Sequence, residues 1–151
     1  MPESAPSNWM QVDDPVETLA GDWTFERTVT DSLSGTTGAA SGIARFERSG
    51  DGLDWDETGT LRFGGHDFDA KRRMSIARED GEWQVRFDDG RPFHPLDLNR
   101  GRCEVGHPCR DDFYSGTIEM LSTGDGPELR TEWRVRGPKK DQLIRTRYRR
   151  V

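Results

Sequence analysis

The chain has 151 residues, which suits one domain with a proper hydrophobic core, and its net charge of −6 argues against a general nucleic-acid binder. Hydrophobic residues make up only 31%, but five tryptophans and 17 glycines favour a folded chain with many turns over a disordered one. No apolar run approaches the roughly 18 residues of a membrane span, and no secretory signal pattern opens the chain. With only two cysteines, Cys103 and Cys109, we expect a cytoplasmic protein without a disulfide framework.

The first 16 residues are rich in Pro, Ser and Asp and lack periodicity, so we expect a flexible lead-in at 1–16 and one domain at 17–151. One helical turn is predicted at 17–20, since Gly21 is a plausible stop. Residues 32–42, rich in Gly, Ser and Thr, are predicted to be a turn region. Alternating hydrophobic and polar residues predict strands around 23–29, 43–48, 53–63, 68–76, 83–87, 114–120, 129–135 and 143–148.

About eight or nine short strands without a long helix predict an all-β fold. An antiparallel sheet of this size hides its edges by closing into a barrel or by stacking as a sandwich. Charges on the apolar strand faces favour the barrel, because a sandwich core has no room for Arg27, Glu57 and Arg72. We therefore predict a single up-and-down antiparallel barrel that encloses a polar pocket.

Residues 87–114 hold both cysteines, two of the three histidines and many charged side chains between strand-like segments. We expect them to gather at the mouth of the barrel, with Arg91 facing the same region. Prolines on both sides hold His94 at a defined angle, which suits general acid–base chemistry. The alternative is a histidine that only satisfies loop carbonyls.

His107 and Asp112 are further catalytic candidates in this stretch, although Asp112 could equally cap the strand that follows. A zinc site made of His94, His107 and Cys109 is the weaker interpretation, because the spacing lacks the paired ligands of common zinc sites. A nucleophilic role for Cys109 is a weaker interpretation than that of a small buried thiol without a catalytic role. We expect neither a metal nor a cofactor.

The charges predicted to face inward form a second candidate site. Arg27 and Arg72 would grip a carboxylate or phosphate, and Glu57 would accept a hydrogen bond or act as a base. A strand register shifted by one residue would put these charges in solvent, and a purely structural ion pair is another alternative. The remaining ligand-binding candidates are the aromatic residues and one lysine, namely Trp23, Phe25, Trp55, Trp133, Tyr148 and Lys140.

Two features resemble known families. Gly21-Asp22-Trp23 opens the first strand and an Arg-rich strand closes the chain, which resembles the lipocalin arrangement of a Gly-x-Trp packed under a late arginine. The segments GDWTFERTV, WDETGTL, FDDGRPFHPL, GHPCRDDFYSG and WRVRGPKKDQLIRTRY resemble domain-of-unknown-function family 6314, an uncharacterised bacterial family described as calycin-like. This resemblance spans residues 19–151 and implies a small β-barrel, but no reaction, substrate or cofactor.

Two functions fit these observations. The first is a small-molecule binding protein, monomer or homodimer, whose pocket holds a small organic ligand with an anionic group. The alternative is a cofactor-independent isomerase, lyase or hydrolase. In that enzyme His94 or Glu57 would move a proton, and arginines would stabilise developing negative charge.

Overall fold

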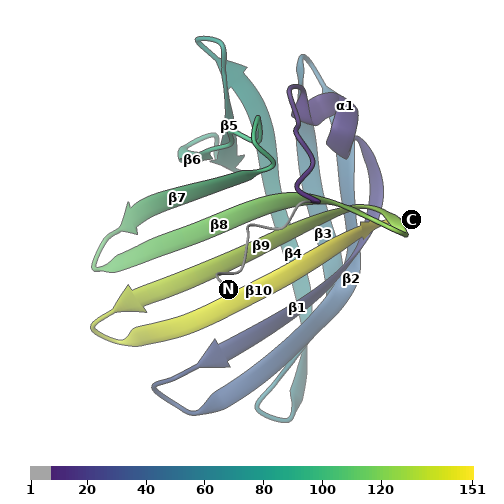
Figure 1. Cartoon of the computed structure of the whole chain (residues 1–151). Coiled ribbons are helices and arrows are strands. Elements are labelled where there is room, and N and C mark those ends of the chain that lie inside the picture. The colour runs from purple at the N-terminus through teal and green to yellow at the C-terminus, as the bar shows by residue number, and fades with distance from the viewer. Residues whose placement is uncertain (1–7) are drawn as a thin grey trace, which may run out of the picture.

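The computed structural model describes residues 8–151 and consists of one short helix and ten β-strands (Figure 1). All paired strands are antiparallel. The elements are α1 (Pro15–Leu19), β1 (Gly21–Asp31), β2 (Thr36–Ser49), β3 (Gly52–Phe63), β4 (His66–Glu79), β5 (Glu82–Phe87), β6 (Pro92–Pro95), β7 (Arg102–Cys109), β8 (Asp112–Thr123), β9 (Gly126–Gly137) and β10 (Lys140–Arg150).

The ten strands form one sheet in the order β6-β5-β4-β3-β2-β1-β10-β9-β8-β7. The sheet curls into a nearly closed barrel whose two edges are β6 and β7 (Figure 1). The first and last strands of the chain lie side by side in the middle of the sheet, where Phe25 faces Tyr148. The predicted all-β antiparallel barrel is confirmed, with ten strands in place of the expected eight or nine.

The additional strands come from segments that were predicted to be irregular. β6 and β7 lie within the polar residues 87–114, and β2 begins at Thr36, inside the predicted turn region. The inner face of β2 carries only small residues at this end, Gly38, Ala40 and Gly42, so no hydrophobic alternation marks it. Gly42 lies directly opposite Gly59 of β3, which lets the two backbones approach closely.

Helix α1 begins earlier than predicted because Asp14 caps it. The Asp14 carboxylate accepts a hydrogen bond of 3.0 Å from the Val16 N–H, and a proline occupies the first turn. The prediction of a flexible lead-in falls partly on residues 1–7, which lie outside the described residues. Further along, the Met10 N–H donates to the Met120 carbonyl at 2.8 Å, and the Val12 side chain is buried.

The end of the barrel next to α1 is closed by apolar packing. Trp23 is fully buried and donates its indole N–H to the Leu19 carbonyl at 2.9 Å. The Arg150 guanidinium lies 4.6 Å above the Trp23 ring and donates to the carbonyls of Thr18 and Ala20. This confirms the predicted tryptophan packed under an arginine of the last strand, and it fixes the helix across the barrel end.

The gap between β6 and β7 is bridged by aromatic rings. Phe93 of β6 stacks on Phe87 of β5 and on Trp133 of β9, with ring centroids 4.5 and 4.9 Å apart. His107 of β7 meets the Phe93 ring edge-on at 5.4 Å. Stacked and edge-on rings at these separations stabilise each other beyond their buried area. We call this set of four side chains the aromatic seam.

We predict that Phe93→Ala destabilises the fold by about 2 kcal/mol, roughly half the loss for a fully buried phenylalanine, because Phe93 is half-buried. Phe68→Ala is the matched control, since Phe68 is 50% exposed, and its effect should stay within about 0.5 kcal/mol. Urea denaturation followed by circular dichroism measures both. Equal unfolding midpoints for the two variants would show that the rings do not hold the seam together.

Candidate functional site

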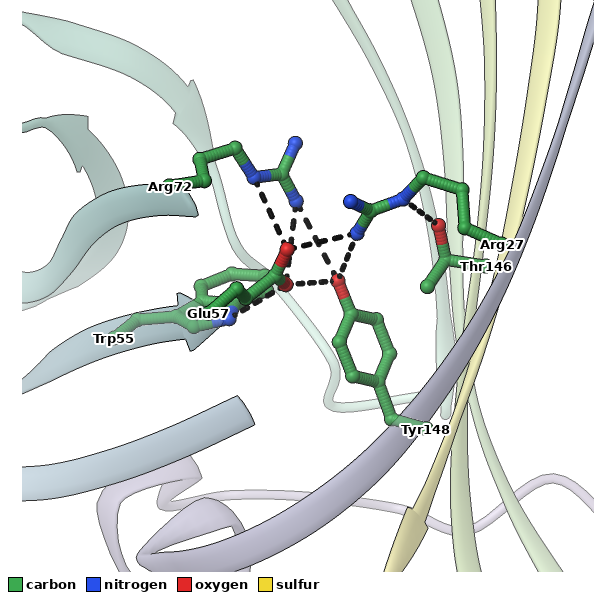
Figure 2. Close-up of polar contacts among 6 residues, drawn as sticks. All are labelled: Arg27, Trp55, Glu57, Arg72, Thr146 and Tyr148. Carbon is green, nitrogen blue, oxygen red and sulfur yellow. Dashed lines mark hydrogen bonds and ion pairs between the residues drawn. The ribbon is translucent and has the colours of Figure 1, made fainter. Parts of the chain in front are cut away.

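A cluster of charged and polar side chains spans the barrel interior (Figure 2). Its members come from opposite walls: β3 and β4 on one side, β1 and β10 on the other. Each faces inward because it lies two or four residues from a buried inward neighbour on its strand, with continuous register. The cluster consists of Arg27, Trp55, Glu57, Arg72, Thr146 and Tyr148.

Glu57 is the centre of this cluster, with only 1% of its side chain exposed. Its Oε1 accepts a hydrogen bond of 2.8 Å from Arg27 Nη2. Its Oε2 accepts from the Trp55 indole N–H at 3.0 Å and from the Tyr148 hydroxyl. Nη2 of Arg72 also donates to Oε2, at 3.4 Å. Both carboxylate oxygens are therefore satisfied within the protein.

The two arginines of the cluster are held differently. Arg27 also donates from Nε to Thr146 Oγ1 at 2.8 Å and is 13% exposed. Arg72 approaches Glu57 only at 3.4 Å, and 40% of its side chain is exposed although it faces the interior. Arg72 is therefore the guanidinium with capacity for a further partner.

The charges of the cluster do not cancel. Burial acts to raise the pKa of Glu57, but Arg72 and Arg27 outweigh it and hold the pKa below its usual value, so Glu57 is a carboxylate at neutral pH. Burial and the neighbouring Glu57 raise the pKa of Tyr148, which stays a neutral hydrogen-bond donor. Two guanidiniums and one carboxylate leave one surplus positive charge in the barrel.

His94 lies apart from this cluster, on β6, and is 6% exposed. Its Nδ1 is 2.7 Å from the Pro95 carbonyl, which can only accept, so Nδ1 carries the proton and Nε2 is left as an acceptor. Burial above all, with the charges of His107 and Arg72, lowers the pKa of His94 to about 4. The imidazole is therefore neutral at physiological pH.

The other predicted residues divide between the seam and the open end of the barrel, opposite α1. His107 and Trp133 belong to the aromatic seam. Asp112, at the start of β8, pairs with Lys140, at the start of β10, at 3.4 Å. Cys109 ends β7 beside Asp112 and is exposed.

Three predicted ligand contacts lie away from the open interior. Arg91 is exposed, pairs with Asp89 at 2.6 Å and lies over the Phe87 ring. Trp23 is enclosed at the closed end, and Phe25 is buried under Arg27. Thr146, which accepts a hydrogen bond from Arg27, was not predicted from the sequence as a site residue, although the alternation of β10 puts it on the same face as Tyr148.

The half of the barrel interior next to α1 is almost completely filled, since the cavity found there is small. An interior cavity of about 20 Å³, room for about one water, is lined by His94, Trp133, Trp55, Arg72 and apolar neighbours. A larger groove of about 750 Å³ crosses the outer face of β9, β10 and β1. Its charges face one another across the strands, as in the pairs Arg147–Glu26 and Arg145–Glu132, so it has little surplus charge to offer a ligand.

Within residues 8–151, no group of three or more His, Cys, Asp or Glu side chains is arranged to hold a metal ion. His94, His107 and Cys109 do not converge on one point of the interior, since Cys109 is exposed at the end of β7. Across the same part of the chain, no helix has the length and apolar character to span a membrane.

The fold and the interior cluster define a calycin-like antiparallel β-barrel with a charged interior. Residues 19–150 match the model of a family of unknown function, DUF6314, and the chain belongs to that family. No curated protein matches the chain.

Several solved structures resemble the barrel, among them two that align with nearly the whole of this chain. The S-type phycobiliprotein lyase CPES from Guillardia theta superposes with a TM-score of 0.63 at 9% identity, over 94% of this chain and 93% of the lyase chain. A protein of unknown function from the DUF3598 family of Nostoc punctiforme gives a TM-score of 0.58 at 13% identity, over 95% of this chain and 50% of the other. At these identities the likeness concerns the fold.

We predict that Tyr148→Phe destabilises the protein by about 1.5–3 kcal/mol, because the buried Glu57 carboxylate loses a charge-assisted hydrogen bond. Tyr114→Phe is the control, since the half-buried Tyr114 hydroxyl makes no hydrogen bond to any side chain or backbone group of the described residues. Thermal and urea unfolding compare the variants. If both behave alike, the Tyr148 hydroxyl does not stabilise Glu57.

The lowered pKa of His94 predicts a pH dependence of stability. The unfolded chain binds a proton near pH 6.5, whereas folded His94 resists protonation until about pH 4, so the free energy of unfolding falls as the pH drops through this window. The loss between pH 7 and 5 should be about 2 kcal/mol. His94→Gln should remove that loss and His66→Gln, at an exposed histidine, should retain it. Urea titrations at each pH measure it, and an unchanged slope in His94→Gln would contradict the assignment.

Proposed function

We propose that this protein binds a small organic molecule with an anionic group, which Arg72 holds inside the open half of the barrel while Arg27 adds positive charge beside it. The observation that carries the proposal is the surplus positive charge of the interior cluster. Arg72 faces the interior and yet is 40% exposed, so a ligand reaches it without disrupting the Glu57 contacts. A guanidinium recognises carboxylates and sulfonates through paired hydrogen bonds.

The likeness of the fold to a phycobiliprotein lyase supports this proposal. It agrees with a role for a barrel of this architecture in ligand or chromophore binding. The inward-facing side chains of Leu61, Phe63 and Phe68 supply apolar walls in the open half, of the kind that organic ligands contact in other pockets. A small molecule as the partner, and a monomeric or dimeric state, remain predictions.

The proton-transfer groups of the alternative enzyme are poorly suited to that role. Glu57 accepts hydrogen bonds from four side chains and has a lowered pKa, so it has little tendency to take a proton. His94 has a pKa of about 4 and an Nδ1 fixed to Pro95. These features favour binding over catalysis.

We predict that 1-anilinonaphthalene-8-sulfonate, an aromatic monoanion, binds the folded protein with a rise in fluorescence. Arg72→Gln should weaken its binding roughly 10- to 100-fold, the loss of a hydrogen bond to a charged group. Arg73→Gln is the matched control, because Arg73 is the next residue of β4, points outward and pairs with Asp56 at 2.6 Å. Fluorescence titration gives both dissociation constants.

Equal affinities of the two variants would place the dye elsewhere and overturn the proposed role of Arg72. Native mass spectrometry of the freshly purified protein, compared before and after denaturation, is an independent check. A retained organic mass that disappears on denaturation agrees with the proposal.

A further inference from the structure

Apolar side chains that face the interior are left exposed at the open end of the barrel. Strand alternation and continuous register direct Val29, Leu61, Phe63, Phe68 and Ile144 inward, like the buried residues further along the same strands. Phe68 is nevertheless 50% exposed and the others are half-buried, whereas Phe46 at the closed end is 1% exposed. The interior therefore presents unfilled apolar surface above the charged cluster.

Charge is arranged by depth in this open half. The surplus positive charge lies at its floor, on Arg72 and Arg27. The rim carries Asp31, which accepts hydrogen bonds from the Leu33 and Ser34 N–H groups, and Asp112, which is already paired with Lys140. An anionic group is attracted to the floor and repelled by Asp31 at the rim. A ligand with one charged end is thus oriented with that end inward.

The number of charges at the floor limits the charge of the ligand. One negative group neutralises the single surplus positive charge of Arg27, Arg72 and Glu57. A second negative charge would be left without a partner in a partly buried site, which is costly. The site therefore favours a monoanion over a dianion.

We infer that the ligand is an amphiphile with a single negative head and an extended apolar body, bound with its head on Arg72 and its body along Leu61, Phe63 and Phe68. This inference rests on the proposed function and names its ligand class. Arg72 lies four positions after Phe68 on β4, a distance of roughly 13 Å along an extended strand. A medium-length alkyl chain such as that of dodecanoate covers this distance.

The test is isothermal titration calorimetry of the wild-type protein at about pH 8, below the micelle concentration, with three probes of equal chain length. Dodecanoate carries one negative charge, dodecyl phosphate carries close to two at this pH, and dodecanol carries none. Dodecanoate should bind at least about tenfold more tightly than either of the others. This comparison needs no variant, so a folding defect does not affect it.

Two matched variants test the path of the apolar body. Phe68→Ser should weaken dodecanoate binding about fivefold or more, and Phe113→Ser should leave it unchanged. Phe68 and Phe113 are 50% and 49% exposed, but Phe113 lies on the outer face of β8, over Gly106. Thermal melting confirms that both variants are folded before titration.

The outcomes separate this inference from the proposed function. Binding of the anilinonaphthalene dye through Arg72 without binding of dodecanoate overturns the ligand class and leaves the anion site standing. If neither probe binds, both proposals are wrong. Dodecyl phosphate or dodecanol binding as tightly as dodecanoate overturns the single-charge argument, and an unchanged affinity in Phe68→Ser overturns the path along β4.

Discussion

The Glu57 carboxylate has almost no contact with water, and the barrel interior is organised by the need to stabilise its charge. Removing a carboxylate from water costs several kcal/mol unless hydrogen-bond donors and opposite charges replace the solvent. Here the donors come from β1, β3, β4 and β10, so they join opposite walls of the barrel (Figure 2). The cluster thus acts as a floor between two halves. Toward α1 the interior is a packed apolar core, and toward the other end solvent reaches the inner face of the strands.

The ionisable side chains of Glu57 and His94 in this interior do not change their protonation state near neutral pH. Arginine neighbours keep Glu57 charged, and burial keeps His94 neutral. Catalytic acids and bases have pKa values near the working pH, whereas a binding site benefits from charges that do not change. The single unbalanced positive charge at the floor is then the feature of the interior that can attract an anion. The aromatic and aliphatic walls supply contact area without charge of their own.

The sequence predicted the parts of the fold that follow a regular period. Arg27, Glu57 and Arg72 were expected to face inward from alternation alone, and no bulge between β1 and β4 shifts their register. β6 and β7 were missed because they are short edge strands that contain prolines and charged residues, the features by which proteins protect sheet edges. The burial of His94 depends on rings from β6 and β9, and no local pattern encodes which distant strands meet when a barrel closes.

The order of the strands also constrains how the chain folds as it is synthesised. β1 pairs with β2 along one edge and with β10 along the other, so its second edge finds a partner only when the last strand exists. Glu57 receives its tyrosine donor from the same late strand. A nascent chain that has not yet released residue 148 from the ribosome therefore holds an incompletely paired carboxylate and an uncovered strand edge. Such a chain is prone to association, and we expect this barrel to complete its folding only after its C-terminal strand has emerged.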